Sequence, residues 1–260
     1  MKVCSFLPAA TQTMYDLGLQ DYLYGVSFEC PPIALQEKKV VVRCILEGNN
    51  YSSEEINTIF SNSVQTGKNL YYLEDEILQS ICPDLIITQD TCEICLIDTK
   101  CVQQLIPKLI KQPAIISISP NTLQDVLNTI LIIGEALNEL EKATLFLSFL
   151  SKKINTIQKK IKENNITPKK ILFLEWLNPF FNCGHWIPNQ IEQAGGIDLL
   201  GVSAKNSYAI SFNDMVKYDP AIIIIAPCGF NIERTEKELF LNLKKQPFYK
   251  LQAVQNNQLF

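Results

Sequence analysis

Short apolar runs rich in branched side chains alternate along this chain with longer stretches in which apolar residues recur every three or four positions. Runs of the first kind are typical of buried strands, and stretches of the second kind of the helices that cover them. The alternation occurs in both halves of the chain and predicts an α/β protein with central, mostly parallel sheets. The expected strands are 2–6, 24–27, 84–88, 114–117, 170–174 and 221–226, and the expected helices are 9–17, 52–65, 73–81, 102–110, 187–193, 212–218 and 232–243.

One segment in the middle of the chain has a much longer helical pattern. From residue 122 to about residue 164 there is no proline, and apolar residues keep the spacing of one helix face. The pattern predicts one long helix, bent at Gly134 or Asn138, that would reach about 60 Å at 1.5 Å per residue. We therefore expect two small α/β lobes, residues 1–120 and 167–260, joined by a backbone helix over residues 121–166.

Composition and charge narrow the classes of partner. The chain has 260 residues, of which 47% are hydrophobic and 19% charged, and its net charge is −4. Such a chain is too apolar to be disordered. No basic run is longer than two residues, as in Lys38-Lys39, which is too short to form a stripe that binds phosphates, so we expect no nucleic-acid partner.

The first residues of the chain and the number of cysteines indicate the cellular compartment in which the protein is found. Residues 1–8 carry one positive charge and an apolar stretch broken by Pro8, too short for the core of a signal peptide. No apolar run reaches the roughly 18 residues of a spanning helix. An odd number of cysteines, nine, fits a reducing compartment. We expect a monomer that is cytoplasmic as the sequence stands, or periplasmic or surface-anchored if the native precursor is longer.

Aromatic residues gather in the expected loops of the second half. Ligands of open parallel sheets bind beyond the carboxyl ends of the strands. Trp176, Trp186 and the pair Phe180-Phe181 fall in such loops. Aromatic side chains there offer a large contact area to a bulky apolar ligand. The alternative is that both tryptophans cap the core of the second lobe.

Thiols and the single histidine occur in the same kind of loop. Cys30, Cys92, Cys95 and Cys228 all follow expected strands, and His185 lies in the sequence Gly-His-Trp. Two thiols at the spacing Cys92-x-x-Cys95 can chelate a soft metal or form a redox pair, but they can also be structural. His185 is either a ligand to a metal or a packing residue. The candidate metal ligands are therefore Cys92, Cys95 and His185.

Sequence signatures of enzymes are missing. The chain contains no GxGxxG, GxxxxGK[ST] or GxSxG motif, and one histidine excludes a histidine-rich catalytic metal site. Glu29, Asp90 and Glu93 are acids near strand ends, where carboxylates commonly cap helices. We expect a protein that binds a ligand without transforming it.

Seven segments of the chain together resemble a known family, the cobalamin-binding branch of the helical-backbone substrate-binding proteins. These proteins serve ABC importers of vitamin B12 and of iron siderophores. The segments are 6–11 (FLPAAT), 25–32 (GVSFECPP), 84–95 (DLIITQDTCEIC), 174–180 (LEWLNPF), 184–188 (GHWIP), 194–196 (AGG) and 226–230 (APCGF).

The resemblance implies a corrinoid in a cleft between two Rossmann-like lobes that opens little, and an ABC permease as partner. It implies ligand contacts from Pro8, Ala9, Glu29, Cys30, Asp90, Cys92, Trp176, Pro179, His185, Trp186, Cys228 and Phe230. Family members usually continue past a segment like 257–260, so we expect the second lobe to be shortened at its C-terminus.

Two alternatives remain open. The first is a thiol-based redox or iron-sulfur protein that uses Cys92 and Cys95. The second keeps the fold and replaces the corrinoid by haem or an iron chelate.

Overall fold

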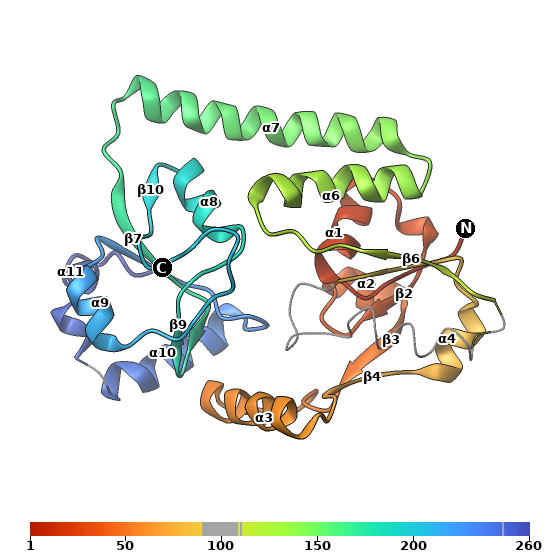
Figure 1. Cartoon of the computed structure of the whole chain (residues 1–260), viewed down its shortest axis with the longest axis horizontal. Coiled ribbons are helices and arrows are strands. Elements are labelled where there is room, and N and C mark those ends of the chain that lie inside the picture. The colour runs from red at the N-terminus through yellow and green to blue at the C-terminus, as the bar shows by residue number, and fades with distance from the viewer. Residues whose placement is uncertain (90–108, 110, 246) are drawn as a thin grey trace. The chain divides into compact units, whose positions relative to one another are not determined.

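Six strands form one sheet in the N-terminal part of the chain (Figure 1). The computed structural model describes residues 1–89, 109, 111–245 and 247–260. The strand order is β4-β3-β2-β1-β5-β6, and all neighbours are parallel except β3 and β4. The strands are β1 (Val3–Ser5), β2 (Leu23–Ser27), β3 (Lys39–Cys44), β4 (Tyr71–Leu73), β5 (Leu85–Thr88) and β6 (Ala114–Ser117).

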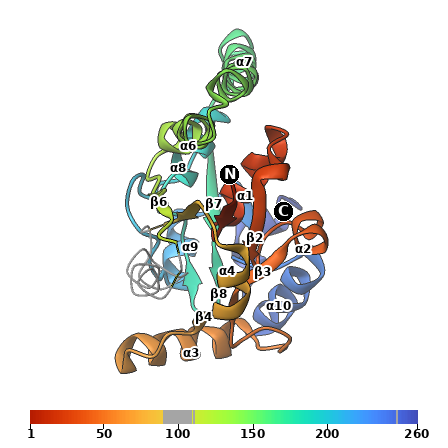
Figure 2. The same cartoon turned by 90° about the vertical axis from the view of Figure 1, so that its right-hand side faces the viewer.

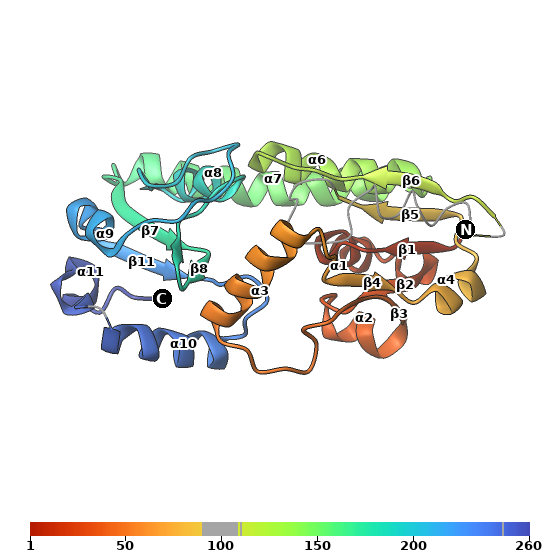
Figure 3. The ribbon, with the colours of Figure 1, turned by 60° about the horizontal axis from the view of Figure 1, so that its bottom comes forward.

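Two neighbouring inner strands of this sheet, β1 and β5, are buried along their whole length. Helices cover both faces of a parallel sheet, which is why such strands are continuous apolar runs. From β1 the chain runs to β2 on one side, while β5 pairs with the other side of β1 (Figure 3). The strand order therefore reverses between β1 and β5, where open α/β sheets place their ligands.

Short helices follow several strands of this sheet. They are α1 (Pro8–Asp16), α2 (Pro32–Glu37) and α4 (Asp75–Ile81). A proline stands at the start of α1 and of α2, where its missing N–H costs no hydrogen bond. After α1 the chain turns at Gly18, whose φ of +67° is a conformation that glycine adopts without strain.

The long helical segment contains two helices, α6 (Leu123–Ala136) and α7 (Leu140–Glu163). The long helix is α7, and its expected start at residue 122 is corrected to Leu140. The chain turns at Asn138, which has a φ of +57°, and α7 runs back beside α6 (Figures 1 and 2). The 24 residues of α7 span about 36 Å rather than 60 Å.

A second, smaller sheet lies in the C-terminal part of the chain. Its parallel strands have the order β10-β7-β11, and β8 and β9 form a separate antiparallel pair. The last residues of the chain extend this sheet, since Leu259 pairs with Ile223 of β11. The strands are β7 (Lys169–Leu174), β8 (Trp176–Leu177), β9 (Phe180–Phe181), β10 (Gly196–Ile197) and β11 (Ile222–Ile225), and the helices are α8 (Ile187–Gln193), α9 (Phe212–Tyr218), α10 (Ile232–Lys245) and α11 (Gln252–Gln255).

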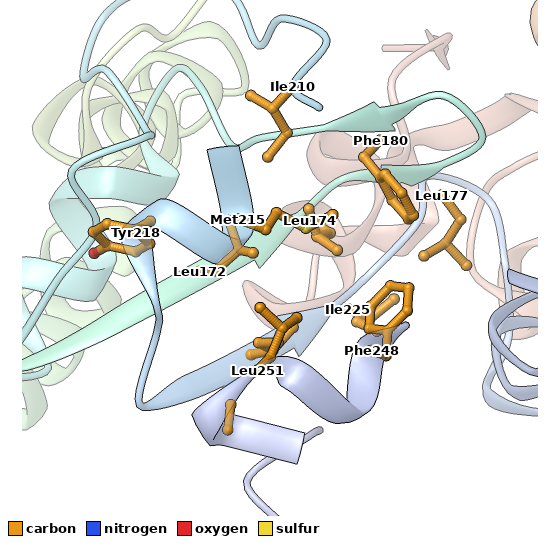
Figure 4. Close-up of a cluster of buried hydrophobic side chains, with 12 residues drawn as sticks. Leu172, Leu174, Leu177, Phe180, Ile210, Met215, Tyr218, Ile225, Phe248 and Leu251 are labelled. Carbon is orange, nitrogen blue, oxygen red and sulfur yellow. The ribbon is translucent and has the colours of Figure 1, made fainter. Parts of the chain in front are cut away.

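An apolar core fills the space between the small sheet and the helices on it (Figure 4). Leu172 and Leu174 of β7 meet Met215 of α9 and Leu251 near α11, and all four are fully buried. Phe180 packs edge-on against Phe248, with 5.8 Å between ring centres. This core fixes the ends of β7 and β11, which carry the loops described below.

The chain divides into two compact units. Unit 1 comprises residues 1–50, 60–120 and 127–148, and unit 2 comprises residues 51–59, 121–126 and 149–260. The division falls inside α7 and also inside α3 (Ser53–Thr66), whose first turns belong to unit 2. Among the described residues, no helix is long and apolar enough to cross a membrane.

The α/β class and the mostly parallel sheets are confirmed, and several local expectations are corrected. The expected helix 73–81 begins at Asp75, because Tyr71–Leu73 is the edge strand β4. The strand β3 was not expected from the pattern, nor was the short pair β8 and β9. The expected helix 102–110 lies almost entirely outside the described residues.

Candidate functional site

The loops after β7 and β11 lie side by side in unit 2. These strands are parallel neighbours with Leu174 opposite Ile225, so both loops leave the same edge of the sheet. The Cys228 N–H donates to the Glu175 carbonyl at 3.3 Å, which links the two loops. Here too the strand order reverses, with β10 on one side of β7 and β11 on the other. The topology therefore brings Trp176, Cys228 and Phe230 to the position where α/β sheets bind ligands.

Trp176 and Phe230 form an aromatic pair at this edge. Their ring centres are 5.1 Å apart and the ring planes are tilted by 58°. Both residues are half-buried. The Trp176 Nε1–H donates to the carbonyls of Ser53 and Asn178, each at 3.2 Å. Because this donor is already used, Trp176 can offer a ligand its ring surface but no hydrogen bond.

Arg234 covers the Phe230 ring. Its guanidinium carbon lies 3.7 Å from the ring centre, within the range of a cation–π contact. Nη2 of the same guanidinium donates to the Tyr51 carbonyl at 2.7 Å. Burial lowers the pKa of Arg234, and the nearby Glu238 charge opposes that shift.

The Gly-His-Trp loop is fastened to the same sheet edge by Glu175. The Gly184 N–H donates to Glu175 Oε1 at 3.2 Å. His185 exchanges backbone hydrogen bonds with a neighbouring loop, donating to the Lys205 carbonyl at 2.6 Å and accepting from the Ala204 N–H at 3.0 Å. A side chain at Gly184 would meet the Lys205 carbonyl at 2.5 Å, so only glycine allows this close approach.

His185 has an uncommon conformation and an unpartnered ring nitrogen. Its backbone φ is +51°, in a region that residues other than glycine rarely adopt. Nδ1 is buried and has no hydrogen-bond partner within the described part of the chain. A buried polar atom without a partner is costly and often marks a functional position. The ring lies 5.8 Å from that of Trp186, the residue just before α8.

Pro8, Ala9 and Cys30 lie close together in unit 1. Pro8 and Ala9 begin α1 directly after β1; Pro8 is half-buried and Ala9 is exposed. Cys30 follows β2 and is only 3% exposed. Its Sγ lies 3.2 Å from Thr11 Oγ1, which itself donates to Ser5 Oγ at 2.9 Å. Burial raises the pKa of the Cys30 thiol and so disfavours its thiolate form.

Glu29 is the exposed acid of the same loop. The pKa of its carboxyl is raised, first because neighbouring protein displaces water from the group and second because Glu47 carries a like charge. The residue as a whole remains exposed. Ionisation of this carboxyl therefore carries an energetic cost.

The remaining predicted residues are placed as follows. Pro179 and Cys228 are exposed. Asp90, Cys92 and Cys95 lie outside the described residues, so the predicted metal or redox pair stays a prediction. Among the described residues there is no group of three histidine, cysteine or acidic side chains that could hold a metal ion. None of the six described cysteines is in a disulfide.

Four polar residues of the site were not predicted from the sequence. Glu175 joins three loops, and Ser53, Arg234 and Glu238 support the aromatic pair. Glu175 stands inside the segment LEWLNPF, directly before Trp176, which was a usable signal. Ser53 and Glu238 are 185 positions apart in the sequence, and nothing in the local pattern connects them.

Comparison with known proteins identifies the family. A family model described as periplasmic binding protein matches residues 5–260. The chain belongs to the periplasmic binding protein family. No curated protein matches it. The predicted family and the prediction of a binding protein that is not an enzyme are confirmed by this membership.

Solved structures of periplasmic binding proteins share the fold. The vitamin B12-binding protein BtuF of Vibrio cholerae is 17% identical, with a TM-score of 0.66 over 99% of this chain and 86% of that one. The haem-binding protein HutB of Vibrio cholerae is 20% identical, with a TM-score of 0.71 over 100% and 88%. An ABC transporter substrate-binding protein of Listeria monocytogenes is 17% identical, with a TM-score of 0.69 over 99% and 87%.

Proposed function

We propose that this periplasmic binding protein captures a corrinoid through the loops that follow the sheet strands in each unit. A corrin is a large, flat and amphipathic ring with amide arms, which suits aromatic walls and a few polar anchors. The same loops would deliver it to the permease of an ABC importer. BtuF, with the same fold, is described as a vitamin B12-binding protein, and the Listeria relative as part of an ABC transporter.

The aromatic pair Trp176–Phe230 carries this proposal. Both side chains are half-buried, stand at the reversal point of the strand order and come from neighbouring loops. Leu172 and Leu174 in the core of the same unit are fully buried, whereas each of the two rings keeps part of its surface accessible. The accessible ring area therefore supports a ligand contact.

Haem is the second candidate, and His185 favours it. Its buried Nδ1 has no partner among the described residues, and imidazole is a common axial ligand of haem iron. HutB, which is described as haem-binding, has a higher identity and TM-score to this chain than BtuF. A cobalt corrinoid with an exchangeable axial position offers the same chemistry to His185.

The family description also bears on location. Because the family is described as periplasmic, we propose a periplasmic or surface-anchored location for this chain in place of the cytoplasmic one expected from its first residues. Protease treatment of cells that carry the native gene tests this, once any outer membrane has been opened and while the cytoplasmic membrane is intact. Digestion of the protein supports the proposed location, and protection until the cytoplasmic membrane is lysed contradicts it.

Spectrophotometric titration tests which ligand the chain binds. Hydroxocobalamin, cyanocobalamin and haemin are added in turn to the purified chain, and the corrin or Soret absorbance is followed. We expect saturable binding of the cobalamins below about 10 μM, a typical affinity for a specific small-molecule site. If only haemin binds, the ligand is haem and not a corrinoid. If none of the probes binds at tens of micromolar, the proposed function is refuted.

A further inference from the structure

The first turn of α3 is held by buried polar side chains of α10, and both belong to unit 2. The N–H and the hydroxyl of Ser53 both donate to Glu238 Oε2, at 3.3 and 2.7 Å. Ser53 is 1% exposed and Glu238 is 8% exposed. One turn earlier on α10, Arg234 donates to the Tyr51 carbonyl. A carboxylate is favourable here because it complements the dipole at the start of α3.

The inward face of α10 is unusual because a polar stripe runs beside Leu239, which packs against the apolar core. Arg234, Glu238 and Asn242 follow one another at intervals of four residues, the spacing of one helix face. Glu238 and Asn242 are both buried, and Asn242 Nδ2 donates to the Glu238 carbonyl at 2.9 Å. The buried face of such a helix is normally apolar. Buried acids are rare unless they have partners, so this stripe indicates a built contact rather than plain packing.

The same turn of α3 also holds the aromatic pair. The Ser53 carbonyl accepts the hydrogen bond of Trp176 Nε1, while the Arg234 guanidinium lies over the Phe230 ring. Asn178, two residues after Trp176, donates to Glu54 Oε2 at 2.8 Å. Both rings are thus fastened, directly or through Arg234, to residues 51–54.

We propose that Glu238 and Arg234 are positioning residues that fix Trp176 and Phe230 through the first turn of α3. The inference rests on the proposed function of these two rings as ligand contacts. Rings that are already oriented lose less conformational freedom when a ligand binds, which strengthens binding. Neither Glu238 nor Ser53 needs to touch the ligand for this effect.

Substitutions of Ser53 and Glu238 test the effect of their hydrogen bond on ligand affinity. We expect Ser53→Ala and Glu238→Ala each to weaken hydroxocobalamin or haemin binding about fivefold to tenfold, the net effect of losing one typical hydrogen bond. The double variant is expected to lose little more, because both changes remove the same interaction. Glu238→Gln keeps an acceptor oxygen and is expected to recover part of the loss. Ser61→Ala on α3 and Glu236→Ala on α10, both exposed, are the matched controls.

Tryptophan fluorescence tests whether Trp176 keeps its orientation in the absence of a ligand. In a Trp186→Phe background, Trp176 is the only tryptophan of the chain. We expect its emission to shift to longer wavelength and its quenching by acrylamide to increase in Ser53→Ala and Glu238→Ala, but not in the two controls. Circular dichroism of each variant confirms that the chain is folded, and Glu238→Gln serves as the readout if Glu238→Ala unfolds it.

The outcomes separate this inference from the proposed function. Unchanged Trp176 emission, or an altered emission with unchanged ligand affinity, overturns the positioning role. If the wild-type chain binds none of the probes, the proposed function fails, and an emission shift in the ligand-free variants still supports the role of α3 in orienting Trp176.

Discussion

Glu175 shows how single residues organise the site. Its carbonyl accepts from Cys228, its carboxylate accepts from Gly184, and its own N–H donates to Phe181 at 3.0 Å. One residue at the end of β7 thereby fixes the positions of three loops. The residues beside it, Trp176 and Gly184, depend on backbone geometry as much as on their own chemistry.

Gly184 allows the Gly-His-Trp loop to pack against residues 204–208. A Cβ there would stand 2.5 Å from both the Lys205 carbonyl and the Ser207 N–H, and backbone atoms cannot move aside as a flexible side chain does. We expect Gly184→Ala to lower the free energy of unfolding by about 2 kcal/mol. Urea unfolding measures the loss. Lys205→Ala, an exposed change in the facing loop, is the control, and equal stability of the two variants would contradict the account.

Glu29 makes stability depend on pH. Its pKa is raised in the folded state, so folding favours the protonated carboxyl and is weakened when the group ionises. The full stability is present below the unfolded pKa, about 4.3, and part is lost as the pH rises through the folded pKa. Glu29→Gln should therefore stabilise the chain at pH 7 and change nothing near pH 3.5. Thermal unfolding at both pH values tests this, with exposed Glu76→Gln as control; a gain at both pH values would contradict the assigned cause.

At the scale of elements, the turn between α6 and α7 decides how the middle of the chain is arranged. The periodicity of residues 122–164 continues across the turn, because both helices present apolar faces with the same spacing. The sequence therefore predicted the helical state and a bend at Gly134 or Asn138, but not that the chain reverses its direction there. That turn depends on close contact between residues of different helices, which local patterns do not encode.

Gly134 makes this contact between the helices possible. A Cβ at this position would overlap the Cβ of Ala143 in α7 and approach the Glu139 carbonyl at 3.2 Å. Alanine is the better helix former by about 1 kcal/mol, but overpacking costs about 1–3 kcal/mol. We expect Gly134→Ala to destabilise the chain by about 1 kcal/mol, whereas Glu135→Ala at the exposed neighbouring position leaves it nearly unchanged. Urea unfolding measures the free energy of unfolding of both variants. A Gly134→Ala variant more stable than the wild type would show that the helices do not meet at this position.

At the scale of the whole molecule, the strand orders explain which site residues could be predicted. Pro8, Trp176 and Phe230 could be placed at the carboxyl ends of parallel strands because apolar runs mark those strands and their loops; that they contact a ligand stays a prediction. Glu238 and Ser53 were missed because their contact joins α10 to the first turn of α3, far apart in the sequence. The grouping of residues 51–59 with unit 2 is likewise a tertiary property that no local pattern reveals.

The central claim is that this chain binds a corrinoid with the help of Trp176 and Phe230, and calorimetric titration with hydroxocobalamin tests it most directly. The wild-type chain is compared with Trp176→Ala and Phe230→Ala, and with Tyr249→Ala, which removes a 68%-exposed aromatic ring of the same unit. We predict saturable heat for the wild type and for Tyr249→Ala, and an affinity about thirtyfold weaker, or ~2 kcal/mol, for each of the other two variants. Equal affinity of all four chains, or no heat with the wild type, would contradict the account.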